Sequence, residues 1–248
     1  MPAWVWLPVS LLLGLLAWEA VVRVGSYPSY LIPKPAEVAA RFSVALQDGT
    51  WWRHTQATLT ESVLGFMLGF SVAVILGYAL AKCRPLVQAL SPYIAASQSL
   101  PVIAIAPLLA LWFGYSLFPR VLVCALVVFF PILVNTLVGL RNIPKDLIEV
   151  AQVYGANALQ TLRLVELPLA LPVLLGGVRL GMTLAITGAV VAEFVGTDVG
   201  LGVLLNIAKG AFDTPLMFVA LLTLITMAAT FYGLATLLDR MLLDWQER

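Results

Sequence analysis

The stretch from Ser62 to Ala81 reads SVLGFMLGFSVAVILGYALA, 20 consecutive residues without Asp, Glu, Lys or Arg. A helix of about 20 apolar residues is long enough to cross the hydrocarbon core of a bilayer. Further charge-free runs follow: 35 residues between Arg84 and Arg120, 20 between Arg120 and Arg141, and 25 between Asp213 and Asp239. None shows the ten-residue alternation of barrel strands. We therefore expect helices, which satisfy their own backbone hydrogen bonds in lipid.

The composition of the whole chain agrees with this. Of its 248 residues, 61% are hydrophobic and only 11% are charged, and the mean hydropathy is +0.99. A soluble domain carries about 25% charged residues, so a soluble enzyme and a disordered chain are both excluded. The formal net charge of +1 leaves no basic surface for nucleic acid. The chain is expected to be an integral, all-α membrane protein.

The apolar runs predict six transmembrane helices, and an even number places both termini on one side. Their expected ranges are 4–24, 58–81, 90–113, 118–140, 169–195 and 215–238. The third is expected to be a single helix kinked at its prolines, because Pro92, Pro101 and Pro107 interrupt it. The first lacks the basic start and cleavage site of a signal peptide, so we expect it to be retained.

The spans divide the chain into four segments. Residues 1–30 hold the first span and a loop, and 31–57 hold an amphipathic helix from Ala36 to Gln47 that lies at the membrane interface. Residues 58–240 form the transmembrane core, which includes a polar loop at 141–168, and 241–248 form a tail.

Catalytic and metal-binding chemistry are not predicted. Cys83, Cys124 and His54 are isolated in the sequence, whereas a zinc site needs about four clustered ligands. There is no Gly-Lys dipeptide and hence no P-loop for ATP. We expect no cofactor and no enzymatic activity.

The polar loop 141–168 reads RNIPKDLIEVAQVYGANALQTLRLVELP. Asp146 and Glu149 have the spacing of a capping box, although Asn142 is an alternative cap. A short helix should run to about Tyr154 and end at Gly155, because glycine takes a left-handed conformation without penalty. A second segment leads to the next span. Helix, glycine turn and helix predict a knob that docks into a soluble partner.

This loop resembles the EAA loop of ATP-binding-cassette (ABC) importer permeases, whose pattern is E-A-A-x3-G-x9-I-x-L-P. The positions that match are Glu149, Ala151, Gly155, Leu167 and Pro168. Val150 and Val165 depart mildly from the usual Ala and Ile. Residues 99–114, 129–140 and 192–202 also look like the nitrate, taurine and aliphatic-sulfonate type of permease.

The resemblance implies a type I importer permease in the inner cell membrane, with the five matched residues coupling it to its ATPase. Its partners would be a second, identical permease chain, two cytoplasmic ATPase subunits and an extracytoplasmic solute-binding protein. The loop and both termini would be cytoplasmic, and residues 31–57 extracytoplasmic. The solute would be a small organic or anionic nutrient: a sulfonate, nitrate, or a pyrimidine or flavin-type vitamin precursor.

Two other classes fit the sequence less well. A stand-alone secondary transporter or channel often shows inverted repeats and buried ionisable relays, and neither is visible. An intramembrane enzyme would need a constellation of His, Asp or Ser residues, which is also not found.

The fifth span predicts a packing face and a candidate translocation path. Small residues recur every fourth position at Gly177, Gly181, Ala185 and Ala189, as they do in the second span at Gly65, Gly69, Ala73 and Gly77. These ladders pack either within one chain or between subunits. On the other side of the fifth span, Arg179, Thr183 and Thr187 form a polar stripe.

The polar stripe has two interpretations. In one, it lines a water-filled route, and Arg179 binds an anionic solute, Glu193 or a neighbouring carboxylate. In the other, Arg179 extends toward the cytoplasm and the threonines bond their own backbone. Further path candidates are Ser97, Gln98, Ser99, Asn135 and Thr136.

Overall fold

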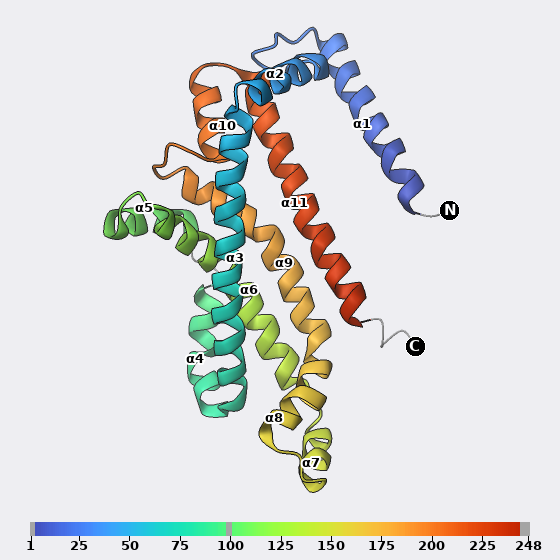
Figure 1. Ribbon diagram of the computed structural model, residues 1–248, viewed down its shortest axis with the longest axis vertical. Helices are drawn as coiled ribbons and strands as arrows, with labels where there is room; N and C mark the ends of the chain where they lie inside the picture. Colours follow the sequence, from blue (N-terminus) through green and yellow to red (C-terminus); the bar gives the residue numbers. More distant parts are fainter. Residues whose placement is uncertain (1–2, 98–100, 244–248) are drawn as a thin grey trace. The chain divides into compact units, whose positions relative to one another are not determined.

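A computed structural model describes residues 3–97 and 101–243, and every element in these ranges is helical (Figure 1). This confirms the predicted all-α class. The elements are α1 (Ala3–Gly25), α2 (Pro35–Gln47), α3 (Thr50–Lys82), α4 (Arg84–Ser97), α5 (Val102–Phe113), α6 (Leu117–Arg141), α7 (Lys145–Val153), α8 (Ala158–Thr161), the π-helix η1 (Leu162–Glu166), α9 (Leu167–Glu193), α10 (Leu201–Gly210) and α11 (Thr214–Leu243).

Five segments of the described chain are long and apolar enough to cross a membrane: α1, α3, α6, the continuous run through α8 and α9, and α11. They correspond to five of the predicted spans. The single kinked helix expected at 90–113 is wrong, because α4 and α5 occupy this region as separate helices. Pro101 is the N-cap of α5, where a residue without an N–H begins a helix more easily than it continues one. At 14 and 12 residues, the two helices are about 21 and 18 Å long, shorter than a bilayer core of about 30 Å.

The chain folds into two compact units. In the described ranges, the first unit comprises residues 3–57 and 198–225. It holds α1, α2, α10, the first two turns of α3 and the start of α11. Trp18 of α1 stacks on Phe218 with ring centroids 5.2 Å apart, and Arg41 of α2 pairs with Asp213 at 2.7 Å. These interactions join segments far apart in the sequence.

The second unit comprises residues 58–197 and 226–243 of the described chain, and α9 packs along α6 at its centre. The glycine ladder of α9 makes this contact. A Cβ added to Gly177 would lie 2.7 Å from the Cβ of Asn135, and one added to Gly181 would lie 2.8 Å from Ile132. Such distances are too short for a side chain. The ladder therefore packs within the chain, the first of the two predicted alternatives.

The ladder of α3 packs against α6 in the same way. Gly65 faces Cys124, Gly69 faces the backbone of Ala125, and Gly77 faces Thr136. Helix α6 is thus held between α3 and α9, and small residues on both let their backbones approach it closely.

Candidate functional site

Residues 142–166 form a knob at one end of the second unit, between the C-terminal end of α6 and the N-terminal end of α9 (Figure 1). It consists of α7, a glycine turn, α8 and η1. The helix–turn–helix order confirms the local structure that the sequence predicts for this loop.

The start of α7 differs from the prediction. Its N-cap is Pro144, and no side chain caps it. Asp146 lies in the first turn rather than at the cap, so the predicted capping box is wrong. Asn142 does not cap α7 either; it closes α6 through its backbone N–H to the carbonyl of Val138. The fixed φ of proline suits the start of a helix, and Asp146 still stabilises the positive end of the helix dipole.

The end of α7 is as predicted. Gly155 has a φ of +80°, a left-handed conformation that strains other residues. Its N–H donates to the carbonyl of Gln152 at 2.9 Å, and the N–H of Ala156 donates to the carbonyl of Ala151 at 3.0 Å. These two bonds form a Schellman motif, which satisfies the last carbonyls of the helix. Two positions of the EAA pattern, Ala151 and Gly155, therefore build this turn.

After the turn, Asn157 begins α8 with a capping box that our sequence analysis missed. The Asn157 side chain accepts from the N–H of Gln160, and the Gln160 side chain accepts from the N–H of Asn157, both at 2.9 Å. The signal was the Asn-x-x-Gln spacing. The helix continues through η1 into α9, with Pro168 in the first turn of α9, where proline is tolerated.

The knob exposes apolar side chains. Val153 and Tyr154 are 86% and 87% exposed, and Leu159 and Leu164 also face outward. Glu149 is exposed as well. Contiguous exposed apolar residues rimmed by polar ones are typical of a protein–protein contact.

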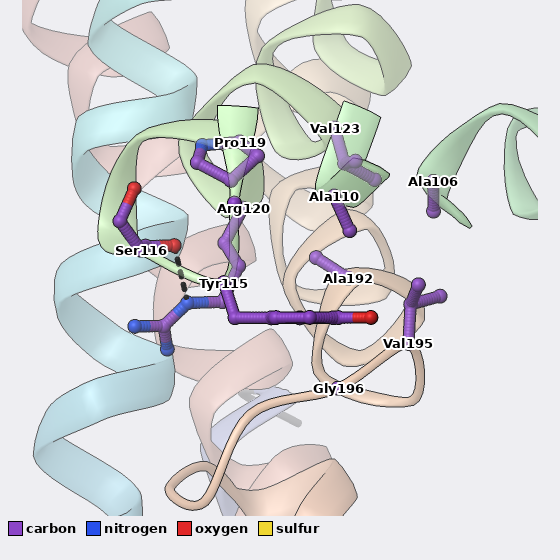
Figure 2. Close-up of a pocket in the computed structure, with 11 residues that line it drawn as sticks. Ala106, Ala110, Tyr115, Ser116, Pro119, Arg120, Val123, Ala192, Val195 and Gly196 are labelled. Carbon is purple, nitrogen blue, oxygen red and sulfur yellow. Dashed lines mark hydrogen bonds between the residues drawn. The ribbon is translucent and has the colours of Figure 1, made fainter. Parts of the chain in front are cut away.

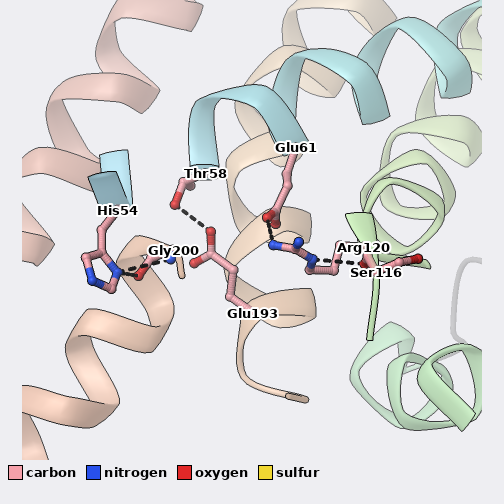
Figure 3. A network of polar contacts seen from close by, with 7 residues as sticks. All are labelled: His54, Thr58, Glu61, Ser116, Arg120, Glu193 and Gly200. Carbon is pink, nitrogen blue, oxygen red and sulfur yellow. Dashed lines mark hydrogen bonds and ion pairs between the residues drawn. The ribbon is translucent and has the colours of Figure 1, made fainter. Parts of the chain in front are cut away.

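Three ion pairs join distant helices of the second unit. Glu61 of α3 pairs with Arg120 of α6, Lys82 of α3 with Glu166 of η1, and Arg179 of α9 with Asp239 of α11. Figure 3 shows the first of them beside the hydrogen bond that Thr58 donates to Glu193 at 2.5 Å. In each pair the carboxylate is buried. In the sequence, Arg120 and Asp239 only mark the ends of charge-free runs, and Glu61 and Lys82 flank the run 62–81.

The polar stripe of α9 has a protein partner at its start. Besides its ion pair with Asp239, the Arg179 guanidinium lies 5.8 Å from the ring centroid of Tyr232. Thr183 donates to the backbone carbonyl of Arg179 at 3.1 Å, and Thr187 is exposed. The sequence left three partners open for Arg179: an anionic solute, Glu193 or a neighbouring carboxylate. In the structure its partner is a neighbouring carboxylate, that of Asp239.

The other path candidates are dispersed over the second unit. Asn135 and Thr136 contact glycines of α9 and α3, respectively. Ser97 donates to the carbonyl of Ile94 at the end of α4, and Glu193 contacts Thr58. Gln98 and Ser99 lie outside the described residues. These side chains do not gather in one cavity of the described structure.

A small pocket lies where α5, α6 and α9 meet, with Tyr115 extended across Gly196 and Arg120 donating to the carbonyl of Ser116 (Figure 2). Its volume of about 10 Å³ is close to the minimum for one water molecule, so it does not hold a nutrient. In the described residues, no group of three or more His, Cys, Asp or Glu side chains is placed to hold a metal ion.

Comparisons with known proteins identify the family. Residues 61–243 match the family described as "Binding-protein-dependent transport system inner membrane component". The riboflavin transport system permease protein RibX of Chloroflexus aurantiacus is 57% identical over 97% of this chain and 90% of its own length. The formylaminopyrimidine transport permease protein ThiX of Halalkalibacterium halodurans is 32% identical over 96% and 94%.

A solved structure supports the fold independently. A chain of the inward-facing MetNI methionine ABC transporter superposes with a TM-score of 0.64 at 21% identity, covering 76% of this chain and 94% of that one. The predicted permease fold is confirmed, and nothing supports a stand-alone transporter or channel. The chain belongs to the family of inner-membrane components of binding-protein-dependent transport systems, and it is an ABC importer permease.

Proposed function

We propose that this permease imports riboflavin or a closely related flavin. The observation that carries the proposal is the 57% identity, over 97% of the chain, to a permease named for riboflavin transport. The identity extends across the whole length rather than one motif, so it includes the membrane helices as well as the loop.

The second candidate is a pyrimidine vitamin precursor, because the formylaminopyrimidine permease also matches along nearly the whole chain. Its identity is only 32%, and an aliphatic-sulfonate permease of Escherichia coli reaches 31%. The sequence thus shares far more with the riboflavin relative than with either of these.

The test is uptake into liposomes that hold the permease with its ATPase, with the cognate binding protein added outside. Labelled riboflavin should enter in an ATP-dependent manner, and unlabelled riboflavin should compete far better than formylaminopyrimidine or an alkanesulfonate. Preferential competition by either of the latter would assign the solute to that class instead.

We further propose that the knob docks into a cleft of a separate ATPase subunit, which hydrolyses ATP while this chain does not. The exposed Val153, Tyr154 and Glu149 support this. Apolar contact area and a rim charge are what a docking helix needs.

Two ATPases would bind two knobs, one from each chain of a permease homodimer. Co-purification of the ATPase with the wild type, and its loss in a Val153→Asp/Tyr154→Asp variant that still inserts, would support the docking surface.

The proposed topology places both termini and the knob in the cytoplasm. Because Lys82 pairs with Glu166, α3 ends on the side where α9 begins, and α6 also ends at the knob. Helix α3 therefore ends on the knob side of the membrane, and α6 begins on the opposite side. The chain between α3 and α6 must then cross the membrane once. We assign this crossing to α4 and α5 together, which keeps six crossings, and residues 31–57 then lie outside the cell.

For the translocation path we keep the polar stripe of α9 as the leading candidate, with Ser97, Asn135 and Thr136 secondary. The exposure of Thr187 supports it. A cysteine at Thr187 should react with a hydrophilic thiol reagent in the assembled transporter, and its reactivity should change with ATP. A cysteine at Gly181, which faces Ile132, should stay unreactive.

A further inference from the structure

An ion pair between Lys82 and Glu166 joins α3 to the knob. Lys82 lies in the last turn of α3, and Glu166 is the last residue of η1, where the knob joins α9. The carboxylate side chain is 2% exposed, whereas the lysine side chain is 48% exposed. A buried carboxylate is tolerated only with a partner, so Glu166 is held at this place by the end of another helix.

The backbone is adapted to turn Glu166 inward. Helix α8 does not pass directly into α9 but through the five-residue π-helix η1. A π segment adds one residue to a helical turn, is rare, and occurs often at functional sites. An extra residue rotates the following positions by about 100° relative to a continuous α-helix. In this arrangement Glu166 is buried, while Leu164 and Leu167 on either side are exposed.

Both residues of the ion pair also line a cleft between α3 and the knob. Tyr78 and Lys82 of α3 line one side, and Ile148 and Gln152 of α7 line the other, around a volume of about 410 Å³. The Lys82 ammonium lies 5.2 Å from the ring centroid of Tyr78, which steadies it by a cation–π contact. In the described ranges, no other ion pair joins the knob to a different helix.

We infer that the Lys82–Glu166 ion pair transmits the movement of the knob to α3 during the ATPase cycle. The inference rests on the proposed docking of the knob. When the ATPase subunits displace the knob, Glu166 draws the end of α3 with it, because separating the charges would leave a carboxylate buried without its partner. Helix α3 packs on α6 through Gly65, Gly69 and Gly77, so the displacement reaches the centre of the second unit through close backbone contact. Lys82 and Glu166 are thus positioning residues for transport.

The experiment uses the complete transporter in liposomes with riboflavin and ATP. Lys82→Met and Glu166→Gln should still insert and retain the ATPase subunit. Riboflavin imported per ATP hydrolysed should fall by about 2- to 30-fold, the range that network couplings of 0.5–2 kcal/mol produce. The exchanged pair Lys82→Glu/Glu166→Lys should recover most of this ratio. Lys209→Met, an exposed lysine of α10, is the matched control and should leave the ratio unchanged.

A second measurement needs no solute. In a Cys83→Ser background, the thiol reactivity of Ser71→Cys on the exposed face of α3 should change when ATP is added, and Lys82→Met should abolish this change. An unaltered ATP response together with an unaltered transport ratio in Lys82→Met would overturn the inference. If Lys82→Met does not insert into the membrane, the exchanged pair and Lys82→Arg take its place. Both variants should keep the ATP response of the thiol, and its loss in both would overturn the inference.

The proposal that riboflavin is the solute can fail without affecting the test of the ion pair. A wild-type transporter that hydrolyses ATP but does not import riboflavin would overturn riboflavin as the solute, while the thiol response still tests the ion pair.

Discussion

At the level of single residues, the second unit is marked by charged side chains at the ends of the apolar runs. Glu61, Lys82, Arg120 and Asp239 each border a charge-free run, and each forms an ion pair across the second unit. The sequence shows where these charged residues are but not which of them pair. Glu61 and Arg120 are 59 residues apart, and Lys82 and Glu166 are 84 residues apart. Pairing at that separation depends on helix packing, which local patterns do not encode.

The Glu61–Arg120 pair leads to a stability prediction. In Arg120→Met, Glu61 would remain fully buried without its cation, which costs about 3–5 kcal/mol in comparable pairs. The variant should unfold at a clearly lower temperature in detergent. Adding Glu61→Gln should restore part of the loss, because the amide is neutral. Equal melting temperatures for wild type and Arg120→Met would show that the pair contributes nothing.

Gly155 leads to a prediction about coupling. Gly155→Val forces a β-branched residue to a φ of +80°, at a local cost of about 1–3 kcal/mol. Recruitment of the ATPase and transport should fall while the chain still inserts. Gly155→Asn is the control, since asparagine tolerates this conformation. If both variants transport normally, the turn is not part of the mechanism.

At the level of helices, the sequence predicted a helix end correctly where the conformational limits of a single residue determine it. Gly155 and Pro168 identified the end of α7 and the start of α9 because the conformational limits of these residues do not depend on the rest of the fold. The cap of α7 was missed because Pro144 replaces a side-chain cap with its own fixed φ. The break at Pro101 was underestimated, because a proline can kink a helix or end it, and only the surrounding packing decides between the two.

The glycine ladder of α9 gives a matched pair of variants. Gly177→Ala should destabilise the α6–α9 contact by about 1–3 kcal/mol, because the added Cβ would lie 2.7 Å from Asn135. The adjacent Gly176 has nothing within 4 Å of that position, so Gly176→Ala should be neutral or slightly stabilising. Thermal unfolding of both in the same detergent compares them. Similar melting temperatures would argue against close packing at Gly177.

Across the whole molecule, the family follows from composition and one loop, and the proposed topology leads to a labelling prediction. In a Cys83→Ser background, Lys145→Cys in the knob should react with a membrane-impermeant thiol reagent only when the cytoplasmic side is open. Lys209→Cys should react in intact cells, because α9 crosses the membrane between the two positions. Labelling of Lys145→Cys from outside would reverse the proposed topology.

The Arg179–Asp239 pair also has a consequence for how the protein is made. Arg179 lies near the middle of α9, and its partner is 60 residues further along the chain. At translation rates of about 5–20 residues per second, Arg179 is synthesised roughly 3–12 s before Asp239. A lone arginine at mid-helix opposes partition into lipid by about 2.5–3.5 kcal/mol. We therefore expect α11 to stabilise the inserted α9 when it arrives, because Asp239 then supplies the carboxylate that Arg179 lacks until that moment.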